Sequence, residues 1–298
     1  MKVLINLLDI LLRQLSYNSL TSLGRILGTI AFYILPSRRK VAIKNAQIIG
    51  IKDPYNVAKE SFKNSFASFL EVFFIKKIDT SFLEKHVIIN NDDVNKILNL
   101  NETFGPYFVV SAHIGSWEIV PKLFTLKFDK VVCIVGRKIK NSNIDNLIKR
   151  LRSDEKIIYL SHRNIAFEIS KLVDKKIIVG TLLDHSALKK DSIYVDFFGL
   201  KTSFIAGIPI LSAKKNIPVV PVFCIRVDKH TLKIICYDPI FPDKNLKPGE
   251  RILNIAEKIN SVYEDIIKKY PEQWYLMHKR FKRVKKDDNQ EETYSIYR

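Results

Sequence analysis

The stretch Tyr107-Phe108-Val109-Val110-Ser111-Ala112-His113-Ile114-Gly115-Ser116-Trp117-Glu118 holds the strongest indication of the fold. Its first six residues form a short, mainly apolar run, which is typical of a buried strand. Similar runs follow at Val131–Val135, Ile157–Leu160, Ile177–Leu182 and Ile217–Ile225. Amphipathic segments that we expect to be helices lie between them, at 116–126, 141–153, 163–173 and 204–215. This alternation predicts an α/β fold with a mixed, largely parallel central sheet flanked by helices.

The segments outside this alternation complete the predicted organisation. Leu232–Cys236 fits an added edge strand, and 248–270 has the apolar spacing of a helix. Residues 1–76 are predicted to be helical throughout. We therefore expect a helical N-terminal region at 1–76, an α/β domain at 77–284 and a polar tail at 285–298. The chain after Phe281 is expected to be frayed.

Composition excludes several protein classes. The chain has 298 residues, of which 47% are hydrophobic, so it can build a large core and is not intrinsically disordered. Its three cysteines form no CxxC pair, which argues against a disulfide scaffold or a cysteine zinc site and fits a reducing compartment. The formal net charge of +18 predicts an anionic partner: nucleic acid, an anionic membrane or an acidic protein.

The N-terminus is the most apolar segment. Residues 3–35 are rich in Leu and Ile, but Asp9, Arg13 and Arg25 interrupt them, so no run reaches the roughly 18 apolar residues of a confident membrane span. No signal-peptide cleavage site follows. We expect residues 1–35 to form apolar helices that associate with a bilayer surface, with two buried core helices as the alternative. The basic cluster at 38–44 suits the anionic cytoplasmic face of a membrane.

A candidate site follows the first apolar run. Reactive groups in open α/β sheets gather at the carboxyl ends of the strands. His113 and Glu118 are separated by four residues. A strand end, a turn through Gly115 and a helix starting near Ser116 would let Glu118 accept a hydrogen bond from one imidazole nitrogen and leave the other free as a general base. Amides at that helix start would favour a developing negative charge. The alternative is a buried structural histidine at a strand end.

The segment His113–Glu118 resembles the HxGNWE-type motif of the bacterial lipid A biosynthesis (late, lauroyl/myristoyl-type) acyltransferases, which belong to the H-x4-D/E lysophospholipid acyltransferase superfamily. Further segments resemble motifs of this family in the same order along nearly the whole chain. They are Arg38–Asn45, the helix at 62–71, Gly136–Asn141 with Asp145 and Arg150, Leu182–Asp184 with Val195–Gly199, Ile217–Phe223, and Pro271–Tyr275 with His278–Lys282.

This resemblance implies transfer of a fatty acyl chain from an acyl carrier protein or coenzyme A thioester to a hydroxyl of a lipid A precursor. His113 would be the general base and Glu118 the residue that orients it. Arg150 matches the position of the family's essential arginine, where it would stabilise an oxyanion or a phosphate; a surface helix arginine is the alternative. Arg137 could clamp a phosphate. Asp184 could orient the acceptor or the arginine, or cap the next turn.

The sequence departs from the family pattern mainly in its second half. The changed positions are Gly136, Lys138, Leu183, His185, Ser186, Asp196 and Lys201–Phe204. These departures keep a lysophospholipid or another glycolipid as an alternative acceptor. The six histidines are scattered, and His185 fits an exposed loop position, so we expect no metal site and no cofactor beyond the thioester co-substrate. No serine-type nucleophile motif is present, which favours direct transfer without an acyl-enzyme.

The charge distribution narrows the choice of partner. The segment Lys127–Arg163 carries ten Lys or Arg against four acidic residues, and Lys279–Lys286 adds six basic residues. The sequence shows none of the usual nucleic-acid-reading modules. We therefore expect anionic membrane lipids and an acidic acyl carrier protein or acyl-CoA as partners, at the cytoplasmic face of a bacterial inner membrane. A non-enzymatic, basic membrane-binding protein is a third hypothesis.

Overall fold

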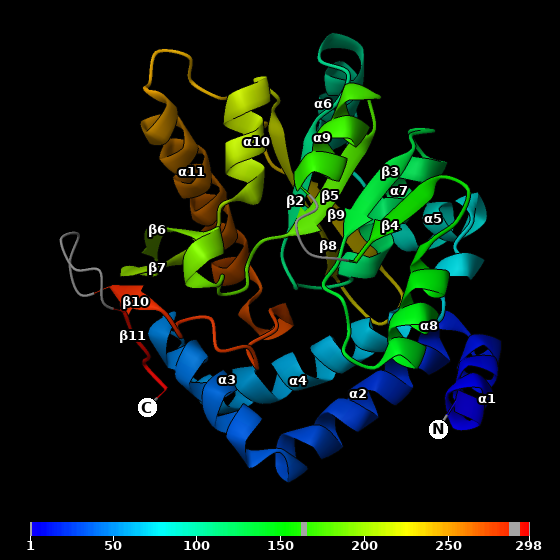
Figure 1. Ribbon diagram of the computed structural model, residues 1–298. Coiled ribbons are helices and arrows are strands. Elements are labelled where there is room, and N and C mark those ends of the chain that lie inside the picture. The colour runs from blue at the N-terminus through cyan, green and yellow to red at the C-terminus, as the bar shows by residue number, and fades with distance from the viewer. Residues whose placement is uncertain (1, 162–165, 286–292, 298) are drawn as a thin grey trace.

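The computed structural model describes residues 2–161, 166–285 and 293–297 (Figure 1). Within these residues the predicted α/β class is confirmed by a seven-stranded sheet of order β1-β9-β8-β2-β5-β3-β4. β8 and β9 pair antiparallel, whereas the other neighbours pair parallel. The strands are β1 (Val87–Ile88), β2 (Phe108–Ser111), β3 (Val132–Val135), β4 (Ile157–Leu160), β5 (Ile178–Leu182), β8 (Val219–Arg226) and β9 (Leu232–Cys236).

Helices connect the parallel strands, as crossovers in a parallel sheet require. The helices of this part are α5 (Thr80–His86), α6 (Asn91–Thr103), α7 (Val120–Leu126), α8 (Ser142–Arg152), α9 (Ala166–Asp174), α10 (Gly207–Lys215) and α11 (Pro248–Lys269). The predicted helix at 163–173 is α9, and its first three predicted residues lie outside the described residues. Because parallel strands direct their carboxyl ends to one edge, β2, β3 and β5 deliver the residues that follow them to the same edge.

A second sheet was not predicted from the sequence. Its described strands have the order β11-β10-β7-β6, with bounds β6 (Ser192–Phe197), β7 (Leu200–Ile205), β10 (Val284–Lys285) and β11 (Thr293–Tyr294). β6 and β7 form a hairpin in which Phe198 and Gly199 both have positive φ, at 51° and 71°. The helix expected at 204–215 therefore begins only at Gly207. The expectation of a frayed C-terminal tail is wrong for the described residues. β10 pairs with β11, and the Phe281 amide donates a hydrogen bond to the Tyr297 hydroxyl.

The N-terminal helices lie across the end of the sheet where β2 terminates (Figure 1). They are α1 (Lys2–Gln14), α2 (Tyr17–Ile34), α3 (Pro36–Ile48) and α4 (Pro54–Glu71). α2 runs alongside α4, and a Cβ atom at Gly24 or Gly28 would lie 2.5 Å from the α4 backbone, so the two glycines permit this close approach. Among the described helices, no single one is long and apolar enough to cross a membrane; α2 and α3, bent by 99°, pass that test of length and composition only as a pair.

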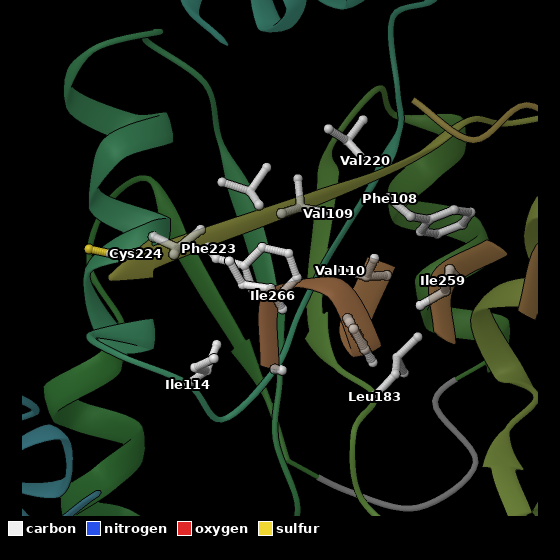
Figure 2. Close-up of a cluster of buried hydrophobic side chains, with 14 of the residues drawn as sticks. Phe108, Val109, Val110, Ile114, Leu183, Val220, Phe223, Cys224, Ile259 and Ile266 are labelled. Atoms are coloured by element: carbon white, nitrogen blue, oxygen red, sulfur yellow. The ribbon is translucent and has the colours of Figure 1, made fainter. Parts of the chain in front are cut away.

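The core explains why the strands are almost continuously apolar. β2 is buried along its whole length, since elements cover both faces of the sheet. Figure 2 shows Val110 of β2 and Phe223 of β8 packing with Ile259 and Ile266 of α11. Phe32 of α2 belongs to the same buried cluster. The N-terminal helices and the sheet thus share one core, which holds the end of β2 in a rigid setting.

Candidate active site

The loop that follows β2 is fixed on two sides. The Gly115 amide donates to the Gln273 carbonyl (3.2 Å), and the Ser116 amide donates to the Cys224 carbonyl of β8 (2.7 Å). Gly115 has a φ of 60°, and a Cβ atom there would collide with the Cys224 carbonyl, so only glycine fits. The loop therefore presents His113 from a single, constrained backbone path.

A buried network of polar side chains supports this loop from below. Glu71 of α4 accepts hydrogen bonds from the Tyr17 hydroxyl (2.7 Å), the Ser116 hydroxyl (2.9 Å) and the Arg226 guanidinium (2.8 Å). Burial and the neighbouring Glu71 carboxylate raise the pKa of Tyr17 well above its usual value, so its hydroxyl stays a donor. Ser68 donates to the Gly115 carbonyl (2.6 Å). α2, α4 and β8 are thus joined to the loop by hydrogen bonds.

His113 is paired with a buried carboxylate. Asp184 follows β5 and is 2% exposed; its Oδ1 lies 2.8 Å from His113 Nδ1. Its Oδ2 accepts from the His113 amide (3.1 Å) and from Trp274 Nε1 (3.0 Å). Burial by itself would raise the pKa of Asp184, but His113, His185 and Trp274 hold it well below the usual range. An ionised carboxylate only accepts, so His113 Nδ1 carries a proton, and in the neutral ring Nε2 is the nitrogen with the lone pair.

Two further imidazoles extend from His113. The His185 ring lies parallel to the His113 ring, with centroids 4.0 Å apart and planes at 6°. His278 stacks on the other face of His185, at 3.9 Å and 17°. His278 Nε2 accepts from the Ser186 amide (3.0 Å), which places the His278 proton on Nδ1. The result is a stack of three rings, His113–His185–His278, beside Asp184.

His185 and His278, the middle ring and the far ring of this stack, are held neutral. Burial, followed by the adjacent His113, lowers the pKa of His185 well below its usual value. Burial also lowers the pKa of His278 to about 4, and the buried cation of Arg280 acts in the same direction. The pKa of Arg280 is itself lowered to about 10 by burial. At neutral pH the proposed base therefore faces an uncharged ring.

The cluster of His113, Asp184 and His185 also has the residue types of a metal site. One potential ligand atom from each lies within 4.8 Å of the others. The two imidazole rings are parallel and 4.0 Å apart, however, so their in-plane lone pairs lie in separate parallel planes and do not converge on a shared ion. The stacked geometry thus favours acid–base chemistry over coordination by both imidazoles.

Comparison with protein families matches residues 2–283 to the bacterial lipid A biosynthesis acyltransferases. The chain belongs to this family. The resemblance inferred from the sequence motifs is therefore confirmed over nearly the whole chain, and membership makes the protein an acyltransferase of lipid A biosynthesis. No curated protein matches the sequence in a separate search.

In this lipid A biosynthesis acyltransferase, Glu118 does not contact His113 in the way predicted. Glu118 is the middle residue of the short helix η2 (Trp117–Ile119). Its Oε2 accepts from Arg152 Nε (2.9 Å), and its Oε1 accepts from Arg152 Nη2 and from Trp117 Nε1 (3.2 Å). The predicted hydrogen bond to His113 is wrong, because both Glu118 oxygens accept from Arg152 and the carboxylate at His113 Nδ1 is that of Asp184. Glu118 instead joins η2 to α8 through a forked ion pair.

Among the described residues, neither predicted arginine forms a hydrogen bond with the His113 imidazole. Arg150 Nη2 pairs with Asp9 of α1 (2.6 Å), and its side chain is 55% exposed. It thus secures α1 to α8, as a surface helix arginine would. Arg137 is exposed in the loop after β3, at the same sheet edge as His113 and Asp184. The amides of Gly115 and Ser116 are also not free for an oxyanion, because both donate to main-chain carbonyls.

The sequence did not predict several contacts of the site. Asp184 was considered for the acceptor or an arginine, not for His113, and His185 was assigned to an exposed loop, although its Nε2 is buried. Trp274 and His278 belong to a segment that resembles a family motif, but the sequence indicated no contact partner for either residue. Arg152 was missed because residues two apart face opposite sides of α8, and the sequence does not show which side faces Glu118.

Proposed function

We propose that this acyltransferase transfers a fatty acyl chain from an acyl carrier protein or coenzyme A thioester to a hydroxyl of a lipid A precursor, with His113 as the general base. The observation that supports this proposal most directly is the 2.8 Å contact between His113 Nδ1 and buried Asp184. It leaves Nε2 as the acceptor, on a side chain that is 21% exposed and thus within reach of a substrate.

The proposed reaction moves the acyl group from the thioester sulfur to the acceptor oxygen. The acceptor oxygen attacks the thioester carbonyl while its proton moves to His113 Nε2. The carbon–oxygen ester bond forms and the carbon–sulfur bond breaks. The imidazolium then returns its proton to the departing thiolate. Asp184 stabilises the imidazolium while it carries the extra charge, and Trp274 keeps the carboxylate in place.

A lysophospholipid or another glycolipid is the alternative acceptor. The observation that favours keeping it is the chain's departure from the family pattern at His185, which here stacks directly on His113. A residue so close to the proposed base belongs to the site that receives the acceptor. The chemistry at His113 would be the same for either acceptor.

Membrane association is part of this proposal. Exposed apolar side chains gather on α1, α2 and the residue that follows α2; they are Leu7, Leu8, Ile10, Leu11, Ile26, Leu27, Ile30, Tyr33, Ile34 and Leu35. Arg38 and Lys40 are exposed at the start of α3, directly after this apolar set. An apolar face next to basic residues suits the cytoplasmic face of a bacterial inner membrane.

The test combines two donors with two acceptors. Purified chain in detergent is given acyl carrier protein or coenzyme A thioester together with a lipid A precursor or a lysophospholipid, and the products are identified by mass spectrometry. We expect ester formation, and a loss of about 10²–10⁴-fold in rate for His113→Ala and for Asp184→Asn. His230→Ala, a change at an exposed loop, is the matched control and should leave the rate unchanged.

Substantial activity in a folded His113→Ala protein would overturn the role of His113. Mass spectrometry of membrane lipids from cells that lack the protein would separate the acceptors. An acyl chain lost from lipid A supports the first, whereas a change confined to phospholipids supports the alternative.

A further inference from the structure

His185 is the middle ring of the stack of His113, His185 and His278, and the proposed acyl transfer does not use it as an acid or a base. His185 covers one face of the His113 imidazole at 4.0 Å, while the Trp117 ring approaches His113 edge-on at 5.4 Å. His185 Nε2 is buried and has no hydrogen-bond partner among the described residues. The relation of His185 to His113 is therefore a contact between ring faces.

We propose that His185 is a positioning residue whose neutral ring, stacked on His113, holds the base in its reacting orientation and stabilises the imidazolium that forms during acyl transfer. This inference rests on the proposed function. Membership of the family does not supply this role, since His185 stands at a position where the chain departs from the family motif that it resembles.

The physical reason is the interaction of a cation with an aromatic face. When His113 takes the acceptor proton, its ring becomes a cation that lies parallel to an uncharged ring 4.0 Å away. Such contacts are favourable, and more so in a site with little water. A charged His185 would instead repel the imidazolium. Among the described residues, the titratable or charged groups around the stack include Asp184, Tyr275, Arg280, Arg38 and Arg283.

His278 completes the arrangement from the far side. Its Nε2 is fixed as an acceptor by the Ser186 amide, so the ring is neutral and cannot rotate freely. It packs on His185 at 3.9 Å. His185 is thereby held between two rings, of which one is anchored to the main chain. This clamp prevents the middle ring from tilting away from His113.

Three substitutions separate the possible roles of His185. His185→Ala removes the ring. His185→Phe keeps an aromatic face without nitrogens, and His185→Gln keeps a polar group near Nε2 without a ring. The rate constant kcat/KM of acyl transfer is measured against pH for each variant. His230→Ala is the control for removal of an exposed histidine, and thermal unfolding verifies that each variant is folded.

We expect His185→Ala and His185→Gln to lower the plateau of kcat/KM by about fivefold and to move the acid limb of the profile to lower pH by about half a unit. Both changes have one cause, because an imidazolium that is less stabilised releases its proton at lower pH and is also harder to form in the transition state. His185→Phe should retain most of the rate and leave the acid limb in place. A purely structural loss would lower the plateau without moving the limb.

Two outcomes would overturn the inference. If His185→Gln is active and His185→Phe is not, a polar contact of His185 matters and stacking does not. If every variant matches the unaltered chain, the ring has no role.

A second measurement does not depend on activity. The titration of the His113 ring is followed by NMR in the unaltered chain and in His185→Ala, and its midpoint should be lower in the variant. An unchanged midpoint counts against the inference. Inactivity of the unaltered chain with every donor and acceptor would instead refute the proposed function. The midpoint of the His113 titration would still show whether stacking of His185 stabilises the imidazolium.

Discussion

At the scale of single residues, Asp184 organises the site. Its two oxygens accept from the side chain and amide of His113 and from Trp274, so the carboxylate is buried without lacking partners. Trp274 directly follows the short helix η4 (Pro271–Gln273) that comes after α11, and His113 lies two residues after the end of β2. One carboxylate thereby sets the tautomer of His113 and joins two distant parts of the chain.

The titration of His278 gives a prediction for stability. Its pKa is about 4 in the folded chain and near 6.5 when unfolded, so the unfolded chain binds the proton first as the pH falls. The free energy of unfolding should therefore decrease from about pH 6.5 down to pH 4, by up to about 3 kcal/mol. Urea unfolding of the unaltered chain and of His278→Gln at a series of pH values measures this.

His278→Gln can still accept from the Ser186 amide but does not titrate, so its stability should fall less over this range. His230→Gln is the control and should lose as much as the unaltered chain, because His230 is exposed. Equal losses in all three proteins would contradict the assignment of the buried neutral ring.

At the scale of elements, the packing of α2 on α4 depends on two glycines, Gly24 and Gly28, which have no side chain to separate the helices. At Gly24 a Cβ atom would lie 2.5 Å from Ala67 Cα of α4, and at Gly28 it would lie 2.5 Å from the Phe62 carbonyl oxygen. The same helix carries Tyr17, whose hydroxyl contacts Glu71 in the network below the loop of His113. A shift of α2 would thus be transmitted to that loop through hydrogen bonds.

Gly24→Ala should destabilise the chain by about 1–3 kcal/mol, because the methyl group would force the helices apart. Gly249→Ala is a matched control. It also lies in a helix, α11, but its Cβ would meet no atom within 4 Å. That change should be neutral or slightly stabilising. Denaturant unfolding compares the two variants, and equal stabilities would refute the close packing of α2 and α4.

The positions of the helices also determine which of the predicted site residues contact each other. The sequence correctly placed His113 and Asp184 after strands, because short apolar runs predict strands and the ends of parallel strands share an edge. It could not pair Glu118, since that depends on where α8 lies. Arg152 faces Glu118 while Arg150 faces Asp9, and both are compatible with the same helical pattern.

At the scale of the whole molecule, charge and apolar surface are distributed unevenly. The exposed apolar side chains lie on α2, which crosses the end of the sheet near His113, and on α1, which lies beside α8 (Figure 1). The basic surface is smaller than the sequence indicated, because Arg280 is 1% exposed and stacks over Phe197. Under the proposed function, we expect a lipid acceptor to approach this end of the molecule.

Replacing Ile26, Ile30 and Ile34 by Gln should lower binding to anionic vesicles at least about tenfold, since these side chains are 58%, 48% and 67% exposed on one face of α2. Leu98→Gln with Leu253→Gln, at exposed sites on α6 and α11, is the control. Deleting residues 1–35 is a poorer test, because it also removes buried Leu20 and Phe32. Vesicle cosedimentation gives the result, and undiminished binding of the triple variant contradicts the membrane face.

The sequence by itself determined the fold class, the family and the strand ends that carry His113 and Asp184. These features follow from local order, since apolar runs, turn residues and motifs are contiguous along the chain. The tertiary structure alone decided that Asp184 pairs with His113, that Glu118 pairs with Arg152, and that His185 and His278 stack beside the base. The physical reason is distance along the chain: 71 residues separate His113 from Asp184, and only packing brings such groups together.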